Sequence, residues 1–298
     1  KEHIYLHKVP IGVAVGICPW NFPFFVMARK VAASLITGNT CVIKPSSEAP
    51  NTIMEFADFI QKIDLPRGVL NFVCGAGRTV GNALSKSPIT GIISLTGSVG
   101  AGQKVISAAA ENMTKVALEL GGKAPAIVCA DANLDLAINS VVSSKVIFSG
   151  QVCNCAERVY VEDSIYDEFV DKLSKKMSEV TIEDALTGVN ADMSSLVSKD
   201  QLDKITEMVE FAKKEGAEVL VGGDRPDKFD KGYFYNPTLL TNVKQDSQII
   251  QEEVFGPVLP VMKFNTLDDA IAMSNDTEFG LTSSIFSENF NNIMKAAR

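Results

Sequence analysis

The sequence predicts an α/β protein of two α/β domains with mainly parallel sheets. Short apolar runs that suit buried strands alternate with helical segments along most of the chain, a pattern typical of a parallel sheet covered on both faces. The chain has 298 residues, enough for two domains, and 46% of them are hydrophobic. Ligands of such folds bind beyond the carboxyl ends of the strands, so functional residues are expected there.

The first expected domain reaches to about residue 121. Two prolines, Pro19 and Pro23, fix a rigid turn around Asn21. Residues 50–63 place apolar side chains on one helical face. The expected elements, in order, are strands over 4–17, a helix over 24–35, a strand over 39–43, a helix over 50–63, a strand over 69–73, a helix over 78–85, a strand over 91–95, a helix over 103–110 and a β-like run over 114–120.

Three loops of this domain carry candidate ligand groups. Lys44 stands at the carboxyl end of a strand, and the loop 97–102 leaves backbone N–H groups at a helix start, where a phosphate can bind. This loop lacks the GxGxxG spacing, so it is only a weak signal of nucleotide binding. The second glycine-containing stretch, 75–77, is interpreted as a tight turn. Glu119, beside two glycines, is a candidate base; the alternative is a solvated turn charge.

The second expected domain continues the α/β pattern to the end of the chain. A polar connector is expected at about 183–198, surface loops at 222–224 and 227–231, a rigid turn at 252–257 and a helix-like segment at the end. The expected elements are a strand over 126–128, a helix over 134–147, a strand over 158–161, a helix over 164–178, a helix around 202–212 and a strand over 217–221.

Cys153 and Cys155 lie in a glycine-containing turn, residues 149–156, between an expected helix and an expected strand. Such a turn can expose a sulfur atom; the alternative is that both are ordinary buried thiols. The two histidines, His3 and His7, stand at the extreme N-terminus. A Cys-His hydrolase would have to recruit one of them across the fold, so a carboxylate is the expected general base.

The composition of the chain indicates which classes of partner and which cellular environment are expected. The net charge is −8, from 36 acidic and 28 basic residues, and no basic block stands out, which argues against a nucleic-acid partner. No apolar run approaches the roughly 20 residues that span a bilayer, and the N-terminus shows no signal region. Six cysteines without a CxxC pair predict neither a disulfide scaffold nor a metal site, and fit reduced thiols in the cytoplasm.

Six motifs, in order and at compatible spacing over essentially the whole chain, resemble those of the aldehyde dehydrogenase superfamily. Each motif is weak alone, and the combination is specific. The residues from Gln151 to Val161 are most similar to bacterial lactaldehyde and glycolaldehyde members. The motifs are Pro19-Trp20-Asn21-Phe22-Pro23, Lys44-Pro45-Ser46, Gly97-Ser98, Glu119-Leu120-Gly121-Gly122-Lys123, Gly150-Gln151-x-Cys153 and Glu253-x-Phe255-Gly256-Pro257.

The resemblance implies oxidation of a small aldehyde, such as lactaldehyde or glycolaldehyde, to its carboxylic acid through a cysteine thiohemiacetal and thioester. Cys153 would be the nucleophile, the Asn21 amide would hold the oxyanion, Glu119 would activate water and Lys30 would relay a proton. Cys155 would be a neighbour without a catalytic role. Arg29 and Asn154 could bind a 2-hydroxyl group; the alternative is a surface charge and a turn residue.

The resemblance also implies NAD as cofactor, with NADP as an alternative. Ser47 stands where the family often has a glutamate on the adenosine ribose, so weak discrimination against NADP is expected. The cofactor-binding positions implied are Trp20, Lys44, Ser47, Gly97, Ser98, Leu120, Glu253 and Phe255.

The organisation implied is a Rossmann-like cofactor domain over 10–121 and a catalytic domain over 122–298, with residues 1–9 as part of an oligomerisation hairpin. The chain is shorter than family members, so it is expected to be truncated at both ends, inactive alone, and a homodimer or homotetramer when complete. Two alternatives stay open: a catalytically silent binding or assembly module, and a coenzyme A-acylating aldehyde dehydrogenase. Glu119 disfavours the second, because acylating relatives tend to lack that base.

Overall fold

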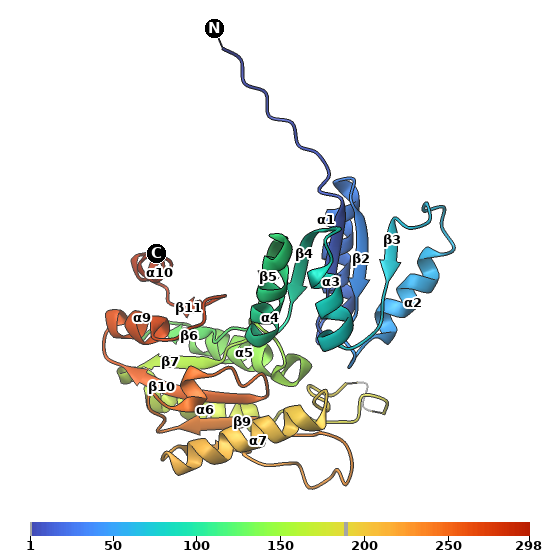
Figure 1. The fold of residues 1–298 in the computed structure, drawn as a ribbon. Helices are drawn as coiled ribbons and strands as arrows, with labels where there is room; N and C mark the ends of the chain where they lie inside the picture. Colours follow the sequence, from blue (N-terminus) through green and yellow to red (C-terminus); the bar gives the residue numbers. More distant parts are fainter. Residues whose placement is uncertain (1, 188–189) are drawn as a thin grey trace. The chain divides into compact units, whose positions relative to one another are not determined.

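A computed structural model describes residues 2–187 and 190–298. The expected connector at 183–198 and the expected hairpin at 1–9 therefore lie partly outside the described residues. The chain divides into two compact units, Lys1–Leu120 and Gly121–Arg298, which are considered one at a time (Figure 1).

The first unit is built on a five-stranded sheet in which every pairing is parallel. Its order is β3-β2-β1-β4-β5, so the direction of winding reverses between β1 and β4. This is the strand order of a Rossmann-like fold, and the predicted parallel α/β class is confirmed. The strands are β1 (Val13–Ile17), β2 (Thr40–Lys44), β3 (Leu70–Phe72), β4 (Thr90–Thr96) and β5 (Lys115–Glu119).

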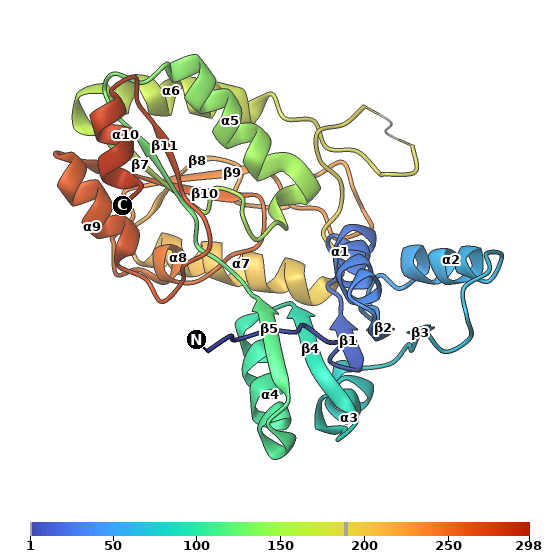
Figure 2. The ribbon, with the colours of Figure 1, turned by 90° about the horizontal axis from the view of Figure 1, so that it is seen from above.

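Helices cover both faces of this sheet, as Figure 2 shows. On one face lie α1 (Pro23–Ile36) and α2 (Asn51–Ile60), where Met27 and Ile53 pack against Ile43 of β2. On the other lie α3 (Asn82–Lys86) and α4 (Val99–Ala109), where Val105 packs against Ile93 of β4. The two apolar layers explain why the strands read as continuous apolar runs.

Three expected boundaries in this unit were wrong. The strand expected over 4–17 begins only at Val13; residues 2–12 belong to no strand, because an alternating pattern becomes a strand only when another strand pairs with its backbone. The helix expected over 103–110 begins at Val99, because the Ser98 side chain caps it. The helix expected over 78–85 is a π-helical turn, Gly77–Gly81, followed by α3.

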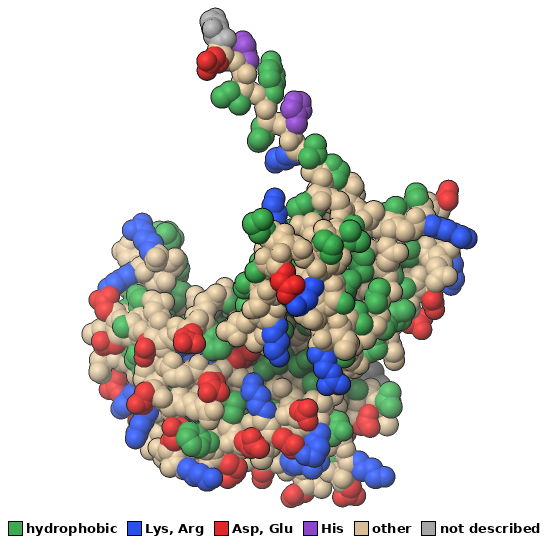
Figure 3. Space-filling model, viewed as in Figure 1, with side chains coloured by type: hydrophobic (Ala, Val, Ile, Leu, Met, Phe, Trp, Pro, Cys, Tyr) green, Lys and Arg blue, Asp and Glu red, His purple; other side chains and the backbone are tan. Residues whose placement is uncertain are grey.

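The N-terminal segment leaves large side chains exposed. Ile4 is 94% exposed and Leu6 is 87% exposed. His3 and His7 are exposed on the same segment, as Figure 3 shows. Neither histidine is packed against the folded part of its unit.

The second unit is built on a six-stranded sheet of order β11-β6-β7-β10-β9-β8. All pairings are parallel except that β8 runs antiparallel to β9. The expected strands over 126–128, 158–161 and 217–221 are confirmed, and β9, β10 and β11 go beyond the predicted elements. The strands are β6 (Pro125–Val128), β7 (Arg158–Glu162), β8 (Glu218–Val221), β9 (Thr238–Thr241), β10 (Val258–Phe264) and β11 (Ser284–Phe286).

Helices also cover both faces of the second sheet. Alternate residues of β7 separate the two layers: Val159 packs with α5 and α6, whereas Tyr160 packs with α9. Among the described residues, no helix has the length and apolarity needed to cross a bilayer. The helices are α5 (Leu134–Val146), α6 (Tyr166–Ser178), α7 (Lys199–Lys214), α8 (Gln248–Gln251), α9 (Leu267–Asn275) and α10 (Phe290–Ala296).

Candidate active site

The candidate residues of the first unit gather at the carboxyl ends of its parallel strands. Asn21 follows β1 across the Pro19 turn, Lys44 ends β2, Gly97 follows β4, and Glu119 ends β5. Because these strands are parallel, their carboxyl ends meet at one edge of the sheet. Residues nearly 100 positions apart in the sequence therefore share one edge, which is where α/β folds bind ligands.

The strand register fixes which of these ends are neighbours. Ile17, the last residue of β1, pairs with Lys44 on one side and with Leu95 on the other. Thr96 pairs with Glu119. The carboxyl ends of β1 and β4 thus flank the point where the strand order reverses, the preferred position for a dinucleotide.

Lys44 is buried and directed at a neighbouring loop. Its Nζ donates to the Pro45 carbonyl at 2.7 Å and to the Gly75 carbonyl at 2.9 Å. Ser47 is exposed, and its hydroxyl donates to the same Gly75 carbonyl at 3.4 Å. Burial lowers the pKa of Lys44. The Gly75 carbonyl, in the tight turn expected at 75–77, thus accepts hydrogen bonds from two of the expected cofactor-binding residues, Lys44 and Ser47.

Lys30 lies inside the first unit, on α1. Its Nζ donates to Ser94 Oγ at 2.7 Å and to Thr96 Oγ1 at 3.1 Å. Burial lowers the pKa of Lys30, and the nearby Cys18 and Glu119 side chains oppose that shift. Glu119 itself is exposed. The hydroxyls of Ser94 and Thr96, which no motif singles out, hold the lysine.

The start of α4 fits the phosphates of a dinucleotide. Ser98 Oγ accepts from the Ala101 N–H at 3.3 Å. A Cβ built on Gly100 would meet nothing within 4 Å, and one on Gly97 would lie 3.6 Å from the Leu95 side chain, an ordinary contact, so the backbone here is open to approach. An 11-residue helix offers orphan N–H groups and a positive dipole end to an anion. The residues present therefore fit the expected cofactor.

In the second unit, the cysteine turn has a strained backbone. Three consecutive residues, Phe148, Ser149 and Gly150, have φ values of 47°, 56° and 74°. Such left-handed conformations cost about 1–2 kcal/mol per non-glycine residue. The Ser149 hydroxyl donates to the Ser194 carbonyl at 2.7 Å, and Gln151 Oε1 accepts from the Val197 N–H at 3.0 Å. The surrounding chain thus holds a costly turn directly before the candidate nucleophile.

The two thiols of the turn lie in different environments. Cys153 is half-buried, and Asn154 beside it is exposed. Cys155 is 2% exposed, and Lys145 Nζ donates to its sulfur at 3.4 Å. Burial raises the pKa of the Cys155 thiol to about 11, although Lys145 opposes the shift. Cys155 is thus a protonated, enclosed thiol, and Cys153 is the more accessible of the two.

Glu253 and Phe255 lie on the turn before β10. Glu253 Oε1 accepts from the Gly122 N–H at 2.8 Å. Burial raises the pKa of Glu253, and the Gly122 N–H opposes that effect. A Cβ on Gly121 would lie 2.5 Å from Glu253 Oε2, so this carboxylate needs a glycine beneath it. Phe255 has a φ of 58° and is thus in the left-handed region, like the strained residues of the cysteine turn.

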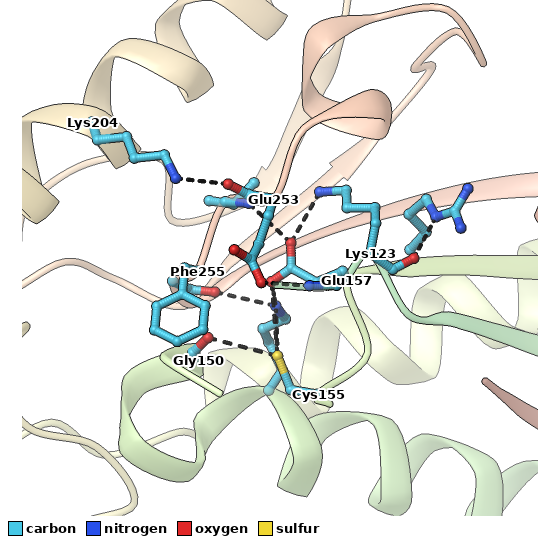
Figure 4. A network of polar contacts seen from close by, with 12 residues as sticks. Lys123, Gly150, Cys155, Glu157, Lys204, Glu253 and Phe255 are labelled. Carbon is cyan, nitrogen blue, oxygen red and sulfur yellow. Dashed lines mark hydrogen bonds and ion pairs between the residues drawn. The ribbon is translucent and has the colours of Figure 1, made fainter. Parts of the chain in front are cut away.

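A buried ion network that no sequence motif indicates lies beside the cysteine turn (Figure 4). Glu157 Oε2 accepts from Lys123 Nζ at 2.9 Å, and Glu157 Oε1 accepts from Lys145 Nζ at 2.8 Å. All three side chains are at most 1% exposed. In the sequence these charges resemble solvated surface residues; the available signal is that Lys123 ends the motif that begins at Glu119 and that Glu157 lies within the recognised segment from Gln151 to Val161. The described residues hold no group of three His, Cys, Asp or Glu side chains suited to a metal ion.

The chain is an α/β protein of two units. One unit has a Rossmann-like sheet with candidate residues at the carboxyl ends of its strands, and the other has an accessible cysteine. Comparison with known proteins narrows this class: the chain belongs to the aldehyde dehydrogenase family, which it matches over residues 1–298. The resemblance seen in the sequence is confirmed.

Individual relatives match nearly the whole chain. Lactaldehyde dehydrogenase of Escherichia coli is 52% identical over 297 residues, and its crystal structure has a TM-score of 0.95 over 97% of the chain. D-glyceraldehyde dehydrogenase (NADP(+)) of Picrophilus torridus is 38% identical over 300 residues, which is 100% of this chain and 60% of that protein. A betaine aldehyde dehydrogenase of Staphylococcus aureus, solved with NAD+, is 36% identical, with a TM-score of 0.93, over 97% of this chain and 57% of its own. The E. coli enzyme is covered over 62% of its sequence and 60% of its solved chain, so the chain spans about three fifths of these relatives.

Proposed function

We propose that the natural protein containing this chain oxidises a small aldehyde to the carboxylic acid with NAD. The observation that carries the proposal is the contrast between the half-buried Cys153, in a strained turn, and the enclosed Cys155 two residues on. The 52% identity to E. coli lactaldehyde dehydrogenase supports the same activity. Cytoplasmic localisation and a homo-oligomeric state remain predictions.

In the proposed reaction, the Cys153 thiolate attacks the aldehyde carbon and forms a carbon–sulfur bond, which gives a thiohemiacetal oxyanion. The Asn21 amide and the backbone N–H of Cys153 are assigned to hold that oxyanion; one such donor contributes roughly 3–4 kcal/mol to the transition state. Bound NAD supplies the acceptor for the hydride that leaves the carbon. The oxidised carbon is then a thioester of Cys153.

Release of the acid requires water and a base. Glu119, exposed at the end of β5, is assigned to take a proton from the water that attacks the thioester. The Cys153 thiolate is the leaving group, so the nucleophile is restored. Lys30, held by Ser94 and Thr96, is assigned to proton relay. The presence of Glu119 favours hydrolysis over transfer of the acyl group to coenzyme A.

The cofactor contacts are assigned from the resemblance to the family, and the positions of Lys44 and Gly97 at the ends of β2 and β4 support them. Lys44 and Ser47 are assigned to the adenosine ribose, and Gly97 and Ser98 at the start of α4 to the pyrophosphate. Glu253 and Phe255 are assigned to the nicotinamide ribose, with Trp20 and Leu120 as further contacts. NAD is proposed as the main cofactor, with weak discrimination against NADP because Ser47 carries no charge to repel a 2′-phosphate.

The proposed substrate is a small polar aldehyde such as lactaldehyde or glycolaldehyde. Arg29 and Asn154 are both exposed and each could hydrogen-bond a 2-hydroxyl group. Arg29 also lies over the Phe25 ring, with its guanidinium carbon 5.6 Å from the ring centroid. A kinetic panel tests this choice: kcat/KM should be highest for 2-hydroxyaldehydes, and a strong preference for long-chain or aromatic aldehydes would contradict it.

Two pairs of measurements test the chemistry in the natural protein. Cys153→Ala should abolish aldehyde oxidation, whereas Cys155→Ala should retain most of it; the reverse result would refute the assigned nucleophile. Glu119→Gln should slow steady-state acid release more than the first burst of NADH. Equal loss of both phases would remove Glu119 from thioester hydrolysis.

A further inference from the structure

Glu157 uses both carboxylate oxygens to join three segments of the second unit. Oε1 accepts from Lys145 on α5, and Oε2 accepts from Lys123, which precedes β6. Oε2 also accepts from the backbone N–H of Val254 at 3.1 Å. Val254 stands between Glu253 and Phe255, the two residues assigned to the nicotinamide ribose. The buried side chain of Glu157 thus binds the backbone of the residue that lies between Glu253 and Phe255.

Lys145 strengthens the same connection at a second point. Besides Glu157, its Nζ donates to the Gly256 carbonyl at 3.2 Å and to Cys155 Sγ at 3.4 Å. The two backbones approach closely here, because a Cβ on Gly150 would lie 2.2 Å from the Gly256 carbonyl oxygen. The turn that carries the nucleophile and the segment 253–257 are therefore fixed to each other through the Glu157–Lys145 pair (Figure 4).

Stability alone does not explain a carboxylate at this position. Buried ion networks are often replaceable by apolar side chains of similar volume without loss of stability, because removing the charges from water offsets their attraction. An apolar residue, however, could not accept the Val254 N–H, nor could it orient Lys123 and Lys145 at once. What the carboxylate alone provides is a fixed location for the Val254 backbone.

We infer that Glu157 is a positioning residue that sets the location of Glu253 and Phe255 for cofactor binding, through its hydrogen bond with Val254 N–H and its ion pairs with Lys123 and Lys145. The inference rests on the proposed function in one respect, that Glu253 and Phe255 contact NAD. Glu157 acts through the backbone of Val254 and does not itself touch cofactor or substrate.

The test is Glu157→Gln in the natural protein, with NAD binding measured by calorimetry in the absence of aldehyde. Glutamine keeps the size of the side chain, but its amide group presents N–H donors where a lysine ammonium needs an acceptor. We expect the NAD dissociation constant to rise at least tenfold, while KM for the aldehyde changes less than twofold. Glu157→Asp, which keeps the charge and shortens the reach, should give a smaller rise, and it decides the question if Glu157→Gln does not fold.

Tyr160→Phe is the matched control. Tyr160 lies on β7, on the face opposite to Val159 and Val161, and its hydroxyl donates to the Met273 carbonyl at 3.2 Å. Loss of that bond should lower Tm without changing NAD affinity, which separates positioning from general destabilisation. A folded Glu157 variant that binds NAD within twofold of the unaltered protein would overturn the inference. Unaltered protein that binds NAD but oxidises no aldehyde would contradict the proposed function and leave the inference supported by the binding result; absence of NAD binding would overturn both.

Discussion

Gly150→Ala should be one of the most damaging single-methyl additions in the second unit. Gly150 has a φ of 74°, and its Cβ position lies 2.2 Å from the Gly256 carbonyl oxygen and 2.3 Å from the Gly256 carbonyl carbon. Both atoms belong to the backbone, so no side-chain rotation can relieve the overlap. The change therefore forces either the cysteine turn or the segment 253–257 to shift.

The expected magnitude has three parts. Alanine in a left-handed conformation costs about 1–2 kcal/mol relative to glycine. Overpacking of a tightly packed site costs about 1–3 kcal/mol more. Replacing glycine reduces the entropy of the unfolded chain, which returns about 0.4–1 kcal/mol. The net loss in free energy of unfolding should be about 1–4.6 kcal/mol.

Urea unfolding of the natural protein, followed by circular dichroism, measures this loss. Gly100→Ala is the control, because Gly100 is an exposed residue of α4 whose Cβ would meet nothing within 4 Å. It should leave stability unchanged or raise it by up to about 1 kcal/mol, since alanine is the better helix former. The reasoning would be refuted if Gly150→Ala lowered the free energy of unfolding by less than about 0.5 kcal/mol.

Three further results are expected. Burial would raise the pKa of Glu157, but the two lysines outweigh that effect and hold the pKa at about 2, below the ordinary 4.5. The stability that comes from its ionised form is therefore present above pH 4.5 and lost as the pH falls toward 2. Between pH 5 and 3 the free energy of unfolding should fall faster for the natural protein than for Glu157→Gln, by up to about 1 kcal/mol per pH unit, and parallel curves would disprove this. Ser47→Glu should raise the ratio of kcat/KM for NAD to kcat/KM for NADP, by a factor that corresponds to a free-energy change on the order of 1–3 kcal/mol. An unchanged ratio would mean that Ser47 does not face the ribose. Gly121→Ala should raise KM for NAD, because the methyl group displaces the Glu253 carboxylate, and an unchanged KM would separate Glu253 from the cofactor.

Local patterns predicted most elements of the first unit and marked Lys44, the loop 97–102 and Glu119 as candidates, whereas Trp20, Lys30, Ser47 and Leu120 were implied only by the resemblance to the family. The carboxyl end of a parallel strand is visible in sequence as an apolar run that stops at a polar residue, as at Lys44 and Glu119. The order of strands in the sheet then determines which ends are neighbours. Boundaries were less predictable when one side chain decided them, as when the Ser98 cap started α4 four residues before the expected position.

Long-range partners could not be predicted. Glu157 lies 34 residues after Lys123 and 97 residues before Val254, with which it shares hydrogen bonds. A charge in a sequence carries no mark of burial, so the three members of the network resemble solvated residues until the fold encloses them. Likewise, nothing in the spacing connects Lys30 with Ser94, 64 residues away.

The register of β7 is protected by charge as well as by apolar contacts. Glu157, just before the strand, meets two ammonium groups on one side. The next residue, Arg158, is 1% exposed and donates to the Met273 and Ser274 carbonyls, at the carboxyl end of α9. A slip of one residue in one direction would bring Arg158 to the position of Glu157, where a guanidinium would face two lysines. A slip in the other direction would bring Glu157 to the position of Arg158, where a carboxylate would face the negative end of a helix. Either misalignment is thus penalised at a buried site, so opposite charges in adjacent positions favour the native register of the sheet.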